Sequence, residues 1–194
     1  MRLSAGLGAL VFLVSGCMSQ EQRAALLNGP YPLQVDYSKS IEDSLRDGGY
    51  SWVSDRVTSA SFPSGENGQG KVSAILVPFS PQASLDYIFH REAAAGLRPA
   101  TLRELLAFGE TYPEVQRKLP IMALGSSADL TVTIIEKVSP RDSMTTMGFS
   151  AIEYRIEQVY PFLGDGLFGR TVNIDWLDDP GAYMMYYACF VHPQ

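Results

Sequence analysis

The spacing of apolar residues changes its period once along this chain, near Ala123, and that change limits the fold more than any other feature. Before it, apolar residues recur three or four positions apart, as Leu102, Leu105 and Leu106 do, which is typical of amphipathic helices. After it, apolar and polar residues alternate over 130–135 and 152–157, and again over 171–176, which predicts strands. Short helices in the N-terminal half and an antiparallel sheet in the C-terminal half define an α+β fold.

Capping signals set the expected limits of the helices. Residues 40–43 and 101–104 have the form of capping boxes, and we expect Gly48 and Gly109 to end these two helices. A third helix, carrying Leu85, is expected to begin after the pair Ser80-Pro81.

Turn residues set the expected strand order. The apolar, β-branched run Lys71–Phe79 predicts a buried strand, and residues 97–100 are expected to be extended because Pro99 restricts its neighbour. Turns are expected at residues 164–166 and 179–181. The last three strands would then form an antiparallel meander that ends with residues 183–191.

The first seventeen residues have the pattern expected of an export signal. A positive Arg2, an apolar stretch over 7–14 and the tetrapeptide Val14-Ser15-Gly16-Cys17 resemble a bacterial lipoprotein signal. The resemblance implies cleavage before Cys17 and modification of this cysteine with a diacylglycerol and an acyl chain such as palmitate. It divides the chain into a signal peptide (1–16), a tether (17–30) and one α+β domain (31–194).

The residue after the cysteine bears on localisation. Lipoproteins kept in the inner membrane usually carry Asp there, whereas this chain has Met18. The resemblance therefore implies a lipid anchor in the outer membrane with the domain facing the periplasm. Inner-membrane anchoring and surface exposure stay open.

A second resemblance covers most of the mature domain. The segment 96–109, followed by Tyr112-Pro113, Pro120-Ile121 and residues 123–126, resembles a family of small bacterial proteins that has no assigned function. The chain departs from that family between 127 and 158, where we expect a long hairpin of its own. The resemblance implies no chemistry.

Composition argues against several functional classes. The formal net charge is −6 and the basic residues form no cluster, so we expect no nucleic-acid partner. If Cys17 is acylated, only Cys189 remains, so no intramolecular disulfide can form. His90 and His192 have no second histidine or cysteine at ligand spacing, so we expect no metal and no cofactor.

No catalytic residue is assigned. The chain has no Gly-x-Ser-x-Gly motif. A periplasmic hydrolase stays as the alternative function, and it would use Asp86 with His90 or the acidic pair Asp175 and Asp178.

The aromatic C-terminal region is the candidate binding surface. Its residues are Trp176, Asp178, Tyr183, Tyr186 and Tyr187. Two interpretations stay open: a central strand packed on both faces, or a surface groove that binds sugars or a partner protein. The segment from Trp176 to Asp178 resembles the Trp-Asn-Asp segment of C-type-lectin-like domains, which makes that fold an alternative, without its calcium site or its disulfides.

These observations favour binding over catalysis. We expect a lipid-anchored cell-envelope module for an envelope glycan, peptide or protein. Besides the aromatic strand, the loops around Gly65 and Asp178 are the expected contact points.

Overall fold

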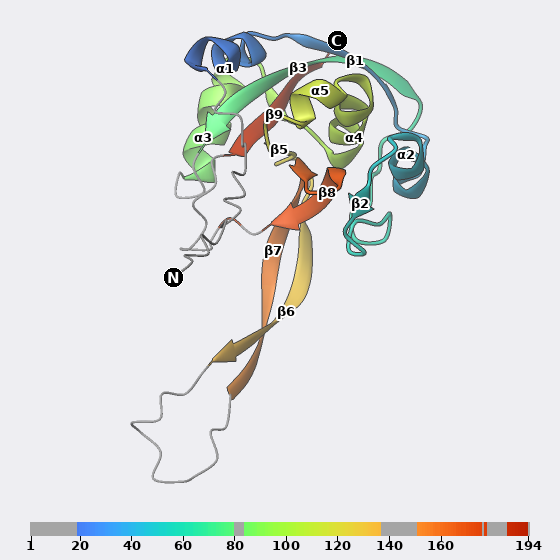
Figure 1. Ribbon diagram of the computed structural model, residues 1–194, viewed down its shortest axis with the longest axis vertical. Helices are drawn as coiled ribbons and strands as arrows, with labels where there is room; N and C mark the ends of the chain where they lie inside the picture. The colour runs from blue at the N-terminus through green and yellow to red at the C-terminus, as the bar shows by residue number, and fades with distance from the viewer. Residues whose placement is uncertain (1–18, 80–83, 137–150, 176, 178–185, 194) are drawn as a thin grey trace, which may run out of the picture.

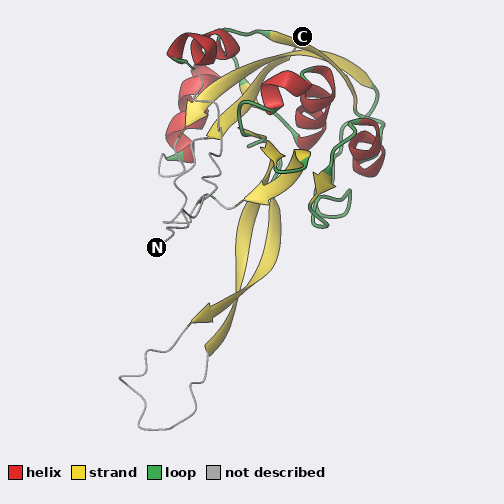
Figure 2. Ribbon diagram, in the orientation of Figure 1, coloured by secondary structure: helices red, strands yellow, loops and turns green. Residues whose placement is uncertain are grey.

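The computed structural model describes residues 19–79, 84–136, 151–175, 177 and 186–193. Within these residues the protein is an α+β domain, as the sequence predicted, with short helices and one largely antiparallel sheet (Figures 1 and 2). The helices are α1 (Gln20–Leu27), α2 (Ile41–Asp47), α3 (Leu85–Ala94), α4 (Leu102–Thr111) and α5 (Pro113–Gln116).

The strands of this sheet come from both halves of the chain. They are β1 (Tyr31–Asp36), β2 (Trp52–Val53), β3 (Gln69–Phe79), β4 (Arg98–Pro99), β5 (Ile121–Met122), β6 (Ala128–Glu136), β7 (Ala151–Gly166), β8 (Gly169–Asp175) and β9 (Tyr186–Pro193). The main order is β1-β3-β9-β5-β7-β8-β2, with β4 pairing β9 and β6 pairing β7. The β5–β9 and β2–β8 pairs are parallel and the others are antiparallel.

Strand β9 is central, and the predicted meander of the last three strands is wrong. β8 pairs with β7 and β2, whereas β9 lies between β3 and β5. Both faces of β9 are covered: Tyr187 and Cys189 belong to a core cluster with α4, and Tyr186 and Phe190 belong to a second cluster with α3. A strand that is apolar on both faces suits this position because it presents no face to water.

Local helix signals were mostly correct. The Thr101–Glu104 capping box is present at the start of α4, and Ser40 caps α2. Helix α3 begins later than expected, because its N-cap is Ser84.

Gly109 does not end α4, which continues to Thr111. A Cβ at Gly109 would lie 2.3 Å from the Tyr50 hydroxyl and 2.9 Å from Leu163, so this glycine permits close packing inside the helix.

The expected long hairpin is present as a two-stranded arm, formed by β6 and the first half of β7 (Ala151–Val159). Figure 1 shows the arm projecting from the body at the end opposite α1. The expected tether is partly folded onto the body. Leu26 and Leu27 of α1 pack against the core, and the Tyr31 hydroxyl donates a hydrogen bond to the carbonyl of Leu26. Across the described residues, we find no helix long and apolar enough to cross a membrane.

Candidate binding surface

Of the residues expected to form a binding surface, only Tyr186 and Tyr187 lie within the described part of the chain. Cys17, Trp176, Asp178 and Tyr183 lie outside the described residues. Tyr186 and Tyr187 are buried. The Tyr186 hydroxyl donates a hydrogen bond to Asp175, and its ring lies 5.5 Å from the ring of Phe162. These two tyrosines are core residues and offer no surface to a glycan or a partner.

Of the residues considered for hydrolysis, the structure describes Asp86, His90 and Asp175. Asp86 and His90 are exposed on α3, and neither lines a described cavity. Asp175 accepts the hydrogen bond from Tyr186, while Asp178 lies outside the described residues. In the described part of the chain, no group of three or more His, Cys, Asp or Glu residues could hold a metal ion.

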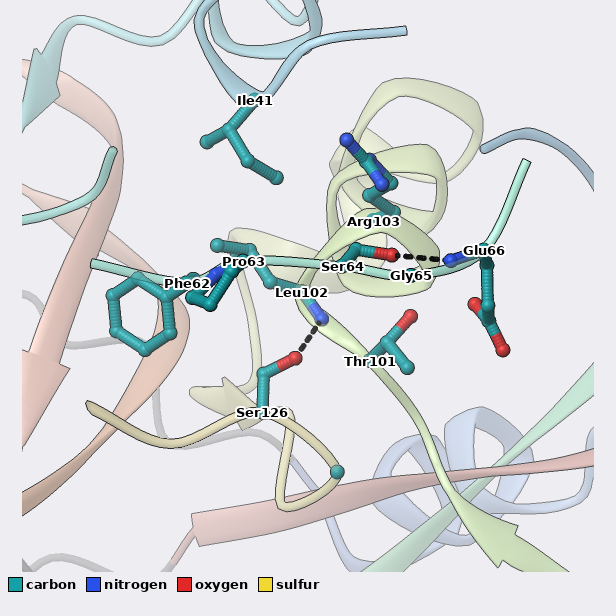
Figure 3. A pocket seen from close by; sticks show the side chains of 11 residues that line it. Ile41, Phe62, Pro63, Ser64, Gly65, Glu66, Thr101, Leu102, Arg103 and Ser126 are labelled. Carbon is teal, nitrogen blue, oxygen red and sulfur yellow. Dashed lines mark hydrogen bonds between the residues drawn. The ribbon is translucent and has the colours of Figure 1, made fainter. Parts of the chain in front are cut away.

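The loop around Gly65 covers a small hollow of about 190 Å³ above the first turn of α4 (Figure 3). Its polar groups are already engaged. The Leu102 amide donates to Ser126 Oγ at 2.8 Å, and Arg103 Nε donates to the carbonyl of Lys39 at 3.0 Å. Of the buried side-chain nitrogens and oxygens in the described residues, every one has a hydrogen-bond partner. No buried side-chain polar atom of the hollow is therefore left without a partner.

A buried ionic cluster lies beside this hollow. Glu104 is 0% exposed, and Arg98 donates to both of its carboxylate oxygens, at 2.6 and 2.9 Å. The Tyr37 hydroxyl donates to the same carboxylate at 2.6 Å, and the backbone amide of Thr101 also donates to it, at 2.8 Å. Arg98 and Glu104 thus form an ion pair in which the carboxylate is fully buried.

The electrostatics of the cluster favour a fixed charge. Burial by itself would raise the pKa of the Glu104 carboxyl, but hydrogen bonds from Arg98 and Tyr37 outweigh burial and hold the pKa below its ordinary value. Burial raises the pKa of the Cys189 thiol, as does nearby Glu104, so the thiol stays protonated and unreactive. Every oxygen of the carboxylate is occupied, which makes the cluster a structural feature.

The most unusual surface feature is the turn between β7 and β8. Leu167 and Phe168 form this two-residue turn, and they are 89% and 91% exposed. The turn expected at residues 164–166 is therefore displaced, because β7 continues to Gly166 and pairs there with Gly169. Gly169 has φ +118°, and a Cβ there would lie 2.5 Å from Ser51 Oγ, so only glycine fits beside the turn.

Two buried or half-buried polar side chains fix the backbone below the turn. Gln116 is buried, and its Nε2 donates to the carbonyls of Gly164 at 2.9 Å and Thr171 at 3.0 Å. Arg170 donates to the carbonyls of Gly109 and Gly48, and its guanidinium lies 4.9 Å from the ring centre of Tyr50. The side chains of Gln116 and Arg170 are directed inward, whereas Asp165 and the two apolar residues of the turn are exposed.

Half-exposed Trp52 lies on the same edge of the sheet. It pairs with Thr171 in the parallel β2–β8 contact, and the neighbouring Ser51 lies against Gly169. Large apolar residues on a rigid turn can serve as anchors in a partner's pocket. The sequence signal for this turn was a pair of apolar residues between two glycines, Gly166-Leu167-Phe168-Gly169. The turn was instead predicted at Gly164-Asp165-Gly166, where two glycines flank an aspartate.

Comparison of the chain with protein-family models, with curated proteins and with solved structures finds no match in any of the three. The lipoprotein and small-family resemblances therefore stay predictions. The C-type-lectin-like alternative gains no support, and the Trp176 and Asp178 positions on which it depended lie outside the described residues. The local geometry of the turn is what indicates function.

Proposed function

We propose that this protein is a lipid-anchored component of the bacterial cell envelope that binds another envelope protein through the Leu167–Phe168 turn. The observation that supports the proposal is the nearly complete exposure of these two side chains on a rigid backbone. Burying a large apolar side chain in a partner contributes roughly 1.5–3 kcal/mol. While these two residues stay in water, they contribute no such free energy to the stability of the unbound protein.

The rigid support favours a protein partner over a bilayer or a glycan. A preformed turn loses little conformational entropy when it enters a preformed apolar pocket, so rigidity strengthens such an interaction. A fluid bilayer rewards rigidity less, and membrane-binding apolar segments usually carry basic residues beside them. Here Asp165 precedes the turn and Arg170 is directed into the body, while Arg117 and Lys118 line a hollow together with Asp165. The buried Tyr186 and Tyr187 rings offer no stacking surface to a sugar.

The proposed anchor is Cys17. Helix α1 begins at Gln20, only three residues later. An extended chain spans at most about 3.6 Å per residue, so the lipid would hold the start of α1 within roughly 11 Å of the membrane. The domain would then sit close to the surface and meet partners in or near the same membrane. The outer membrane is the proposed location because Met18, and no aspartate, follows the cysteine.

The anchor is tested by Cys17→Ser in the full chain. The variant should leave the membrane fraction and fail to incorporate labelled palmitate. A variant that stays membrane-bound and acylated would overturn the anchoring proposal.

The binding proposal is tested by placing a photoreactive phenylalanine at position 168 of the full chain in cells that produce it. The matched control is the same group at Tyr87, an aromatic residue that is 65% exposed on α3. We expect one protein adduct of defined mass from position 168, lost when Leu167→Ser is added, and no adduct from position 87. Adducts with lipid alone, equal adducts from both positions, or no adduct at all would contradict the proposal.

A further inference from the structure

The arm leaves strand edges unpaired. Among the described residues, β6 pairs only with β7, and over 151–158 β7 pairs only with β6. Ile156 is 74% exposed, and Thr131, which pairs with it, is exposed too. An isolated two-stranded ribbon is marginally stable in water, and an unpaired edge is a ready template for another strand. Within the described residues, the arm therefore presents an edge at which a further strand can pair.

We propose that the arm is completed by the arm of a second copy of this chain, with the two β7 strands pairing antiparallel about Tyr154. A two-fold axis pairs residues that lie equally far from it on either side. About Tyr154, Glu153 lies opposite Arg155 of the second copy, and Ile152 lies opposite Ile156 of the second copy. The symmetry creates each of these pairs twice. Opposite charges and paired β-branched residues are favourable at such register positions.

Other registers of the same edge are less complementary. A two-fold axis at Glu153 pairs Glu153 with itself, and one at Arg155 pairs Arg155 with itself and Glu153 with Glu157. Like charges directly opposite each other are destabilising. An axis at Ile156 pairs Arg155 with Glu157, but it also places Glu153 opposite Val159, which is buried in the body. Among the registers that pair described residues with one another, the Tyr154 register alone joins opposite charges without reaching the buried part of β7.

The outer edge of β6 lacks this complementarity. Its ionisable residues over 128–136 are Asp129 and Glu136, which are both acidic. Two β6 edges would therefore bring together no opposite charges. Pairing through β7 gives a four-stranded ribbon in the order β6-β7-β7-β6, with the two bodies at its opposite ends.

This arrangement leaves the helical ends of the molecules clear of the contact. Figure 1 places α1 at the end of the body away from the arm, so the two α1 helices lie at the outer ends of the pair. The contact does not use the Leu167–Phe168 turn, and it stands independently of the binding function proposed above.

Cysteine crosslinking in the full chain tests the register. Opposite residues in an antiparallel pair have Cα atoms about 4.5–5.5 Å apart, which a disulfide can bridge. Tyr154→Cys should therefore give a disulfide-linked dimer under mild oxidation. Native Cys189 is fully buried, and the unsubstituted chain controls for both native cysteines.

Two matched variants control for the wrong edge and the wrong register. Thr133 pairs with Tyr154 inside one arm, so the two Thr133→Cys positions would lie three strand spacings, or about 14 Å, apart. The two Ile156→Cys positions would lie four residues apart along the strands, or about 13 Å. Neither should crosslink. Efficient crosslinking through Thr133→Cys or Ile156→Cys, or none through Tyr154→Cys, would overturn the proposal.

Charge reversal tests the Glu153–Arg155 pairing. In the Tyr154→Cys chain, Arg155→Glu should lower the crosslinked fraction at least tenfold, because Glu153 then faces a second glutamate. Adding Glu153→Arg should restore it, which shows that the single variant still folds. A single reversal without effect, or a double reversal without recovery, would contradict the pairing.

Discussion

The ionic cluster around Glu104 and the Leu167–Phe168 turn both reverse the usual pattern of burial, in which charged residues are exposed and large apolar residues are buried. The first buries a carboxylate completely, and the second exposes a leucine and a phenylalanine almost completely. The buried carboxylate has a donor for each oxygen, from Arg98, Tyr37 and Thr101. The exposed pair, in contrast, is not covered by any described part of the fold. The difference indicates that the cluster serves stability and that the turn is free to serve binding.

The largest expected effect comes from breaking the cluster. Arg98→Met leaves the Glu104 carboxylate buried without its cation, which should lower the free energy of unfolding by about 3–5 kcal/mol. Urea denaturation measures the change. The control is Arg117→Met: Arg117 forms an exposed i,i+3 pair with Glu114 at 3.4 Å, and its loss should cost less than about 0.5 kcal/mol. Equal effects from the two variants would remove the distinction between the cluster and the surface.

Acid provides a second way to disturb the cluster while leaving every residue in place. Hydrogen bonds hold the pKa of Glu104 in the folded protein below its ordinary value. The stabilisation from its ionised form is therefore fully present above the unfolded pKa of about 4.3 and is lost as the pH falls through the folded pKa. We expect the denaturation midpoint to decline between pH 5 and pH 3.

Glu104→Gln should flatten that decline. Part of the slope should remain, because the pKa values of Glu42 and Asp43 are also lowered by hydrogen bonds, to Ser59 and to Ser40. Phe168→Ser should leave the pH profile parallel to that of the unsubstituted chain. An unchanged slope in Glu104→Gln would show that this carboxylate does not contribute.

The cluster was predictable because its signals are local. A capping box joins residues three apart, and Arg98 and Glu104 are separated by one turn and the start of a helix. Because these separations are short, the local chain geometry alone brings Arg98, Thr101 and Glu104 close together. Local signals also predicted α2 and β3.

The turn and the strand order depend on contacts between distant segments. The support of the turn joins Gln116 to Gly164 and Arg170 to Gly48, over 48 and 122 positions. The central place of β9 depends on its pairing with β3, more than a hundred residues earlier. Periodicity identified β6, β7 and β8 as strands but carried no information on their neighbours. The helix end predicted at Gly109 was wrong for a related reason. From the sequence alone, a glycine that permits close tertiary packing cannot be distinguished from a glycine that ends a helix.

A smaller effect is expected at the junction between the two regions. Gly109 lies in α4, which carries Glu104, and its carbonyl accepts a hydrogen bond from Arg170 below the turn. Gly109→Ala would force its Cβ against Tyr50 and Leu163, and overpacking of this kind should cost about 1–3 kcal/mol.

Gly65→Ala is the matched control, because nothing lies within 4 Å of the added Cβ. Its effect should stay within about 0.5 kcal/mol. Thermal unfolding followed by circular dichroism compares the two variants. A harmless Gly109→Ala would show that α4 can move away from Tyr50, and the turn would then be less firmly supported than its hydrogen bonds indicate.

The smallest expected effect is at the turn itself. The double substitution Leu167→Ser with Phe168→Ser removes apolar surface that is already in water, so the free energy of unfolding should change by less than about 0.5 kcal/mol. Phe108→Ala, at a fully buried position of α4, should cost about 3–5 kcal/mol in the same assay. If the double variant lost more than about 1 kcal/mol, the turn would be packed against the fold in solution. Its exposure would then no longer support a role in binding, and the contrast with the Glu104 cluster would disappear.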